Sequence, residues 1–473
     1  MIDLDRWAAL AHVAPLHERV ARYLSDGVDA GEYPPRRPMP STRDLAAQLG
    51  VSRTTVRTAY DRLVASGLLI ARERAGFFPA IAPAQAPPAD RSAPDVARRL
   101  VRRPPALPGA VDVDYLEHPF PFLTGQPEPG TFPSRAWLQA AGRAMSGRNL
   151  AASLIDPQEG DDPLLVRQII DRVLAPKGVR AEPEQVLITC GTQQGLFLLT
   201  YLLVGERTTV AMGSPGYVDA ERIFSATGAV MRYLPVDGRG VRMPRTVRAD
   251  LVYLNPSHHN PTNATLSADR RIELLDRAEA EDMLLIEDDF DSEVRFRGAP
   301  VRPMAAAGSP RVIYLGTFSK FLAPGVRIGY VVADPRLIEQ LRRARHYSTK
   351  APSPMIQRTL ALFLESGDHD VQLRRHRVAL RGKWEATIEA LERHFPWELT
   401  DVPTGGLGFW LTGPDGYSAT ALARRARARG VLVSPGGLHH FTAPRRDESI
   451  RLGIASIPQA RIEPGIRLLS SLV

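Results

Sequence analysis

The sequence predicts a multidomain protein in which a small α+β module precedes a large α/β domain. The chain has 473 residues, more than a single hydrophobic core usually organises. Helical periodicity dominates residues 12–80, whereas short β-rich runs alternate with helical segments from about residue 112 onward. Residues 81–111 are rich in Pro, Ala and Arg without a periodic apolar pattern, which is typical of a linker. We therefore expect domains at 12–80 and 112–473, joined by that linker.

The composition is that of a globular protein in a reducing compartment. Hydrophobic residues make up 44% of the chain and charged residues 24%, and the single cysteine, Cys190, excludes an intramolecular disulfide and a clustered-thiolate metal site. The adjacent histidines at 258–259 and 439–440 lack the spacing of metal ligands. The start of the chain lacks the features of a secretory signal, and the longest apolar run, 196–204, is too short to span a membrane and predicts a buried helix. We expect a cytoplasmic protein without a metal site or a membrane segment.

Residues 41–66 carry the signals of two short helices joined by a tight turn. Ser41 and Asp44 form a capping-box-like start, and Gly50 ends this first helix. Ser52 caps the second helix, whose apolar residues lie on one face: Val56, Ala59, Tyr60, Leu63 and Val64. A β-ribbon with a glycine turn at Gly76 follows. This order predicts a winged helix-turn-helix.

The exposed face of this module has the chemistry of a DNA-reading surface. Between residues 36 and 74 there are eight Arg and three acids, so the segment carries a local excess of positive charge. Arg suits guanine edges, while Ser and Thr suit phosphates and bases. The alternative is a helical docking domain with a solvated basic face. The residues that we expect to contact DNA are Arg43, Ser52, Arg53, Thr54, Thr55, Arg57, Arg72 and Arg74.

The string from Pro40 to Val56 resembles the GntR class of winged-helix regulators closely. That resemblance implies double-stranded DNA as a partner. The net charge of +8 is compatible with such a polyanion.

The second domain has the strand pattern of a largely parallel sheet. Its β-rich runs lie at 186–189, 209–212, 251–254, 284–286, 312–315 and 328–332. A long polar helix at 371–394 is followed by strands at 408–411, 431–433 and 449–452. We expect a large lobe at about 150–350 and a small C-terminal α+β lobe at about 360–473. Trp137 and Trp410 are expected in the core.

Several residues at predicted strand ends suit pyridoxal phosphate, which needs a lysine, a carboxylate for its ring nitrogen and a phosphate cradle. The chain has only four lysines, and Lys320 follows the strand at 312–315. Asp288 ends the strand at 284–286, although the acids around it are equally typical of a solvated turn or a cation site. Gly191, Thr192 and Gln193 follow another strand and open a helix, where backbone N–H groups hold phosphate.

Together these pieces resemble the fold type I aminotransferase superfamily, and more narrowly the MocR subfamily of GntR regulators, over nearly the whole chain. The matching motifs are Glu159-Gly160 with Asp162-Pro163, and the segments 189–194, 214–217, 256–258, 286–289, 316–320 and 451–453. The resemblance implies the PLP-dependent transferase fold with pyridoxal 5'-phosphate as its cofactor. It makes Lys320 the aldimine lysine and Asp288 the partner of the ring nitrogen. Tyr217 would stack on the ring, Arg451 would take an effector carboxylate, and the phosphate would be held by Thr192, Thr317, Ser319 and Arg327.

Two positions depart from the pattern of the family. Phe290 stands where a tyrosine usually binds the phenolic oxygen of the cofactor, so one donor is missing. Asn260 resembles the Asn of true aminotransferases and can supply this hydrogen bond instead. Asn263 replaces the usual glycine of that turn, which is tolerable because Asn accepts left-handed backbone angles.

The favoured hypothesis is a regulator that senses an amino acid or amine by aldimine exchange at Lys320. The alternatives are an active aminotransferase that carries a DNA-binding domain, and a vestigial, empty site. The resemblance also implies a head-to-tail homodimer, whose two readers require an operator with paired half-sites.

Overall fold

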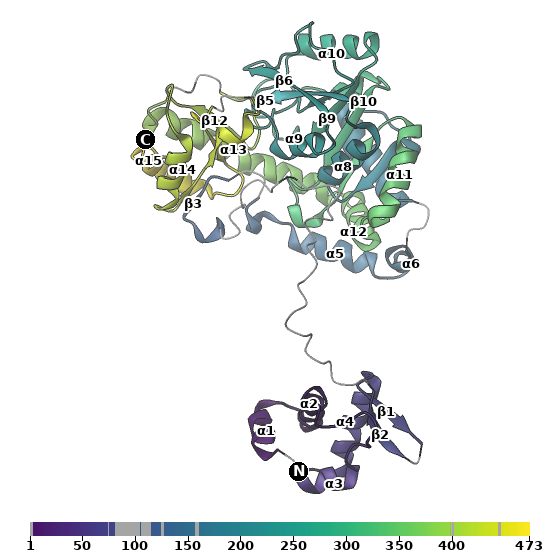
Figure 1. The fold of residues 1–473 in the computed structure, drawn as a ribbon. Coiled ribbons are helices and arrows are strands. Elements are labelled where there is room, and N and C mark those ends of the chain that lie inside the picture. The colour runs from purple at the N-terminus through teal and green to yellow at the C-terminus, as the bar shows by residue number, and fades with distance from the viewer. Residues whose placement is uncertain are drawn as a thin grey trace. The chain divides into compact units, whose positions relative to one another are not determined.

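The structure, a computed structural model, divides the chain into two units at Met1–Arg102 and Arg103–Val473 (Figure 1). It describes residues 3–73, 75–80, 105, 115–123, 127–156, 160–397, 399, 402–442 and 446–473. Apart from residue 105, the expected linker at 81–111 lies outside the described residues. The same holds for Arg74, predicted to contact DNA, and for Glu159 of the matching motifs.

The N-terminal unit is a winged helix-turn-helix. Its elements are α1 (Leu4–Ala9), α2 (Leu16–Asp29), α3 (Thr42–Leu49), α4 (Arg53–Ala65), β1 (Leu69–Arg72) and β2 (Gly76–Pro79). Val20, Leu24 and Val56 are fully buried between the helices, and burial of each such side chain contributes about 1.5–3 kcal/mol. β1 and β2 pair antiparallel, and the Tyr60 ring stacks on Phe77 with the ring centroids 4.5 Å apart, which holds the ribbon on α4. The predicted fold class of this unit is confirmed.

The second unit is built on an eight-stranded sheet with the order β4-β11-β10-β9-β8-β5-β6-β7. Neighbouring strands from β10 to β6 run parallel, whereas β11 and β7 are antiparallel to their neighbours. The prediction of a largely parallel sheet is therefore confirmed. The strands are β4 (Val186–Thr189), β5 (Thr209–Ser214), β6 (Val230–Asp237), β7 (Gly240–Val241), β8 (Leu251–Leu254), β9 (Leu284–Asp289), β10 (Val312–Thr317) and β11 (Gly329–Val332).

Helices cover both faces of this sheet and make it the middle layer of the large lobe (Figure 1). One face packs against α8 (Thr192–Leu203), α9 (Val218–Ser225) and α11 (Pro335–Thr349). The other face packs against α5 (Ser134–Ala144), α7 (Pro163–Gln168), α10 (Ala268–Ala280) and α12 (Pro354–Glu365), and α6 (Asn149–Leu154) packs on α12. Side chains alternate between the faces along each strand, so this layering decides which side of the sheet each polar residue reaches.

The small lobe contains a three-stranded antiparallel sheet with the order β12-β15-β14 and a separate parallel pair of β13 with β3. Its elements are α13 (Asp368–His394), β12 (Gly408–Thr412), α14 (Ala419–Arg427), β13 (Val431–Leu432), β14 (Ser434–Pro435), β15 (Ser449–Gly453), α15 (Ile462–Ser470) and β3 (Phe120–Pro121). Phe122 lies in the core of this lobe, and a Cβ at Gly465 would lie 2.7 Å from its ring. Residues that precede the large lobe in sequence therefore complete the small one.

The prediction that the apolar run at 196–204 forms a buried helix is wrong in one respect. The helix, α8, is present, but Phe197 is 57% exposed and Tyr201 is 65% exposed. The run contains apolar residues on all sides, whereas only one side of α8 contacts the sheet. No helix in the described part of the chain is long and apolar enough to cross a membrane.

Candidate functional site

The carboxyl ends of neighbouring parallel strands bring most of the predicted cofactor residues to one edge of the sheet. Gly191, Thr192 and Gln193 follow β4, Tyr217 follows β5, and Asn260 follows β8. Asp288 lies in β9, whereas Thr317, Ser319 and Lys320 lie at the end of β10 or just after it, and Arg327 precedes β11. Arg451 lies in β15 of the small lobe. It is close enough to this edge for its charge to lower the pKa of Lys320.

Asp288 is buried and has one carboxylate oxygen free. Its Oδ2 accepts a hydrogen bond from the Tyr253 hydroxyl at 2.6 Å, and its backbone oxygen accepts one from Asn255 Nδ2 at 3.0 Å. Its Oδ1 is buried without a partner among the described residues. Burial raises the pKa of Asp288 to about 6, which leaves it ionised at neutral pH. A buried, unpartnered anion of this kind fits the protonated nitrogen of a pyridine ring.

The acids next to Asp288 face away from this site, and the alternative of a solvated acidic turn is wrong. Glu287 accepts hydrogen bonds from the backbone of Met304 at 2.9 Å and of Ala305 at 2.8 Å, and burial raises its pKa to about 7. Asp289 accepts a hydrogen bond from Lys177 Nζ at 2.9 Å. Strand alternation assigns Asp288 to one face and its two neighbours to the other.

Lys320 is half-buried and lies in a charged environment near Asp288. Burial lowers the pKa of its amine, and the charge of Arg451 lowers it further, whereas Asp288 and Asp291 partly offset this shift. A lysine with a depressed pKa is more often unprotonated, and an unprotonated amine can attack a carbonyl carbon. Lys320 therefore has the environment of a nucleophilic lysine.

The residues predicted to hold phosphate converge around the start of α8. Gly191 caps this helix with φ +82°, and a Cβ on Gly329 would lie 2.8 Å from its backbone, so β11 approaches it closely. Arg327 Nη2 donates a hydrogen bond to the Cys190 carbonyl at 2.7 Å, and the backbone of Ser319 donates one to Thr317 Oγ1 at 3.1 Å. Free N–H groups, hydroxyls and a guanidinium together make a site for an anion.

Tyr217 and Asn260 follow β5 and β8 at the same edge of the sheet. The Tyr217 hydroxyl lies 3.1 Å from both Gln193 Oε1 and Asp219 Oδ2, to either of which it can donate. Asn260 Oδ1 is buried without a partner among the described residues, and the Nδ2 of the same amide is a hydrogen-bond donor. Phe290 offers no hydroxyl. Asn263 has φ +58°, as expected for the glycine position that it occupies.

Arg451 supplies a buried cation on the small-lobe side. It pairs with Trp410 across β12 and β15, is 7% exposed, and its Nε has no partner among the described residues. Burial lowers its pKa to about 10, which leaves the guanidinium charged at neutral pH. A desolvated guanidinium with free donors can bind a carboxylate.

Local sequence pattern assigns no role to Tyr253, Asn255, Asp291 or the side chain of His258. Tyr253 and Asn255 orient Asp288, and His258 Nδ1 lies 2.9 Å from Asp291 Oδ1. Their position is the signal that could identify them: Tyr253 lies in the buried strand β8, Asn255 and His258 follow it, and Asp291 follows β9. His258 also lies in a matching motif.

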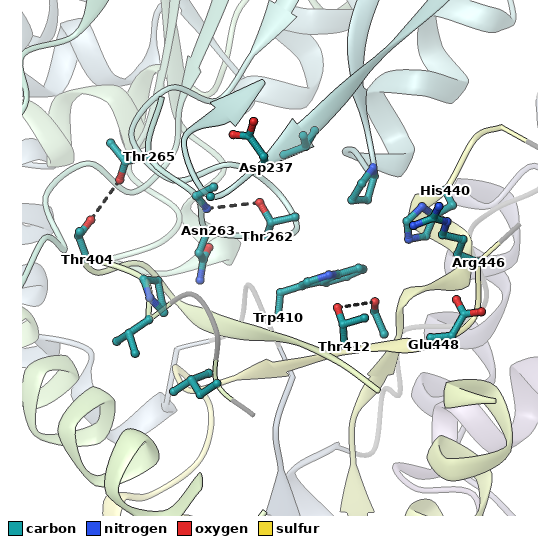
Figure 2. Close-up of a pocket in the computed structure, with 18 of the residues that line it drawn as sticks. Asp237, Thr262, Asn263, Thr265, Thr404, Trp410, Thr412, His440, Arg446 and Glu448 are labelled. Atoms are coloured by element: carbon teal, nitrogen blue, oxygen red, sulfur yellow. Dashed lines mark hydrogen bonds between the residues drawn. The ribbon is translucent and has the colours of Figure 1, made fainter. Parts of the chain in front are cut away.

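A cavity of about 600 Å³ lies beside this site, between the two lobes (Figure 2). Figure 2 shows Trp410 between the loop that carries Thr262 and Asn263 and the strands of the small lobe. Trp410 therefore lines a cavity, and the prediction that it belongs to the core is wrong. Trp137 packs against the core cluster of the large lobe. The described lining of the cavity includes none of the residues predicted to hold the cofactor.

The predicted DNA-contacting residues other than Arg74 lie on the exposed side of the N-terminal unit. Ser41 and Ser52 cap α3 and α4, accepting hydrogen bonds from the backbone of Asp44 at 3.1 Å and Thr55 at 3.0 Å. Arg43, Arg53, Thr54, Arg57 and Arg72 are exposed, as is Ser52, while Thr55 is half-buried.

Some of these side chains already have partners. The Ser52 and Thr55 hydroxyls lie 2.8 Å apart, and Arg57 Nε lies 3.1 Å from Asp61 Oδ1 one turn later. The guanidinium of Arg72 lies 4.5 Å from the centre of the Phe78 ring, which places it on the wing. Arg53 and Thr54 are exposed at the start of α4, and their contact with base edges stays a prediction.

Comparison with known proteins identifies a family for each of the two units. Residues 16–78 match the family "Bacterial regulatory proteins, gntR family", and residues 122–469 match "Aminotransferase class I and II". The HTH-type transcriptional regulator TauR of Rhodobacter capsulatus is 39% identical over 95% of both chains. The probable rhizopine catabolism regulatory protein MocR of Rhizobium meliloti is 32% identical over 100% of this chain and 95% of its own. The chain belongs to the MocR subfamily of GntR-type transcription regulators.

The aminotransferase-like unit of this regulator also resembles solved enzymes. The α-aminoadipate aminotransferase LysN of Thermus thermophilus, solved in complex with N-(5'-phosphopyridoxyl)-L-leucine, is 31% identical, with a TM-score of 0.67 over 74% of this chain and 91% of its own. The fold class predicted from the sequence is confirmed, and the fold belongs to a pyridoxal-phosphate-dependent family.

Proposed function

We propose that this regulator binds pyridoxal 5'-phosphate and controls transcription in response to an amino acid or amine that exchanges with Lys320. The observation that carries the proposal is the free, buried Oδ1 of Asp288, which lies near the depressed-pKa amine of Lys320. An unpartnered buried anion lowers the stability of the fold, so a purely structural role does not explain it. A cofactor nitrogen would neutralise it.

The residues present fit this cofactor on both sides of its ring. Asp288 would hold the ring nitrogen, Tyr217 would cover one face, and Asn260 would donate a hydrogen bond from its Nδ2 to the phenolic oxygen. The start of α8 with Arg327 would bind the phosphate. When bound, the cofactor supplies a carbonyl carbon with which amines condense.

The effector would use two groups of the protein. Its amine would replace that of Lys320, and a carboxylate, where present, would pair with Arg451. Arg451 belongs to the small lobe and Lys320 to the large one, so an effector that contacts both favours one arrangement of the lobes. An effector can shift an equilibrium only through such differential contacts.

The direct test is an absorbance spectrum of the purified protein with and without a panel of amino acids and amines. We expect a visible band from the cofactor joined to lysine, and a shift of that band with the effector alone. Absence of the band after addition of pyridoxal phosphate would overturn the cofactor assignment and leave only the DNA-binding half of the proposal.

A second candidate is an active aminotransferase that carries a DNA-binding domain. Asn260 favours it, because true aminotransferases use an amide at this position, whereas Phe290 removes a donor. Repeated turnover with an added keto-acid acceptor would support the enzyme, and a single stoichiometric exchange would support the regulator.

We also propose a head-to-tail homodimer, supported by exposed apolar side chains on the large lobe. Phe197 and Tyr201 on α8 lie next to α11, where Tyr347 is 90% exposed. Lys350, just after α11, forms an ion pair with Asp156 beyond α6, a region that exposes Leu154 and Ile155. Exposed apolar surface of this extent is typical of an interface.

Replacing both Phe197 and Tyr201 with Glu should convert the dimer into a monomer, because two charges would lose their hydration in an apolar interface. Light scattering during size-exclusion chromatography measures the mass. The matched control is Ile272→Glu on α10, which replaces an equally exposed apolar residue elsewhere. A double variant that stays dimeric would show that α8 is not part of the dimer interface.

Replacing Arg53 with Ala should weaken binding to the preferred DNA site by roughly 10-fold to 100-fold, the range of one guanidinium contact to a base. Fluorescence anisotropy at fixed salt measures this on a duplex that the wild-type protein has selected from random sequence. Arg62→Ala is the matched control, because this arginine lies on the same helix but pairs with Glu18. Equal losses in both variants would indicate general charge attraction rather than base recognition.

A further inference from the structure

A closed turn carries Asn260 at the edge of the sheet where the cofactor would bind. The backbone of Asn263 donates a hydrogen bond to the carbonyl of His259 at 2.6 Å, and the backbone of His259 donates one to the carbonyl of Ala264 at 2.9 Å. The described residues offer no hydrogen bond to the side chain of Asn260, whose Oδ1 is buried without a partner. The turn, rather than a hydrogen bond of its own, therefore decides where the Asn260 amide lies.

The side chain of Asn263 fastens the tip of this turn to the small lobe. Its Nδ2 donates a hydrogen bond to the carbonyl of Gly408, the first residue of the edge strand β12. Asn263 is 1% exposed, and a Cβ on Gly406 would lie 3.0 Å from its Cγ, so the amide fits closely against the segment that leads into β12. At the base of the turn, Thr265 Oγ1 lies 3.1 Å from Thr404 Oγ1. The turn is thus held at its tip and at its base.

The backbone of Asn263 alone does not call for an asparagine. Its φ of +58° lies in the left-handed region, which glycine adopts without steric cost. The asparagine adds what a glycine lacks, a buried donor that reaches a strand of the other lobe. The contribution of this side chain is therefore to be sought in what the hydrogen bond to Gly408 holds in place.

We propose that Asn263 is a positioning residue, which through its hydrogen bond to Gly408 holds the amide of Asn260 at the phenolic oxygen of the cofactor. This inference rests on the proposed function and names a residue that acts at the same site through Asn260. The Nδ2 of Asn260 would donate to the phenolic oxygen and stabilise its anionic form. Without that donor the oxygen holds the proton of the neighbouring lysine–cofactor linkage more firmly, so the linkage loses its proton at a higher pH.

The test is a pH titration of the visible band of the full-length protein loaded with pyridoxal phosphate. We expect Asn260→Ala to raise the midpoint of this titration by about one pH unit, as the loss of one hydrogen bond to a charged group would. Asn263→Gly should raise it by at least about half as much, because glycine keeps the left-handed backbone but removes the donor. In the double variant the midpoint should equal that of Asn260→Ala alone, because both changes remove the same hydrogen bond.

Asp282→Gly is the matched control for this titration. Asp282 is exposed, has φ +56° and precedes β9, at the opposite end of that strand from Asp288, so the variant makes the same backbone change away from the cofactor. It should leave the midpoint unchanged. The charges that act on Lys320 are the same in every variant and cancel in the comparison: Asp288, Asp291, Arg327 and Arg451.

The outcomes separate this inference from the proposed function. Absence of the visible band in wild type overturns both. A band with the same midpoint in wild type and Asn260→Ala overturns the inference, while cofactor binding at Lys320 stands. A midpoint that rises in Asn260→Ala but not in Asn263→Gly overturns the role of Asn263. A double variant whose midpoint exceeds that of Asn260→Ala also overturns it, because Asn263 would then act by a separate route.

Discussion

Replacement of Lys320 with Ala should abolish both the visible cofactor band and every spectral response to amines. Lys320 is the lysine beside Asp288 and Arg451, and the arginines that act on it, Arg451 and Arg327, cannot replace its amine, because a guanidinium does not condense with a carbonyl. The loss should therefore be complete rather than partial. DNA binding should persist, because the reader has its own buried core, separate in the chain from the cofactor site.

Lys350→Ala is the matched control for this experiment. Lys350 is exposed and forms an ion pair with Asp156, so its loss should leave the band unchanged. Absorbance measures the cofactor, and fluorescence anisotropy measures DNA binding in the same preparations. A band that survives in Lys320→Ala would move the attachment to another lysine, and Lys177 and Lys383 are the two with largely buried side chains.

Replacement of Asp288 with Ala should weaken cofactor binding by roughly 10-fold to 100-fold. A hydrogen bond to a charged group contributes about 1.5–3 kcal/mol, and its removal would also leave the Tyr253 hydroxyl without its acceptor. Equilibrium dialysis against pyridoxal phosphate measures the affinity. Tyr253→Phe is the graded comparison, because it keeps the carboxylate but removes the donor that orients it. An equal loss in both variants would indicate a packing defect.

The affinity for the cofactor should also depend on pH through Asp288. Burial raises the pKa of this carboxyl from its usual value to about 6. The ionised form pairs with the protonated ring nitrogen, so affinity should be full above pH 6 and fall as the pH falls through about 6. Asp288→Asn, which does not titrate, should flatten this dependence, and an unchanged profile in that variant would assign the titration to another group.

Most of the fold could be predicted from the sequence because its elements carry strong local signals. The caps at Ser41 and Ser52 and the left-handed Gly50 mark the helices of the reader, and capping is a local interaction. The buried strands are continuous apolar runs bounded by polar turns, which is the pattern of a parallel sheet covered on both faces. The resemblance to a known family then implied how these elements are arranged in the fold.

Errors arose where the environment of a residue is set by segments distant in the chain. Trp410 was expected in the core but lines a cavity, because the loop at 262–265 and the small lobe stand apart there. Phe197 and Tyr201 were expected to be buried, but the sheet covers only one side of α8. Phe122 joins a lobe built almost entirely from residues far downstream. Apolar character alone does not identify the partner of a side chain.

The sequence by itself determined the two units and the strand ends. It also identified Lys320, Asp288 and Arg451 as candidate site residues, because residue type and local pattern can be read directly from the chain. Only the tertiary structure decided which atoms remain free: Asp288 Oδ1, Asn260 Oδ1, Arg451 Nε and Asp291 Oδ2. The physical reason is that burial and hydrogen-bond satisfaction depend on neighbours from separate strands and from both lobes. Tyr253 occupies one oxygen of Asp288, and His258 occupies one of Asp291, which leaves the opposite oxygens for a ligand.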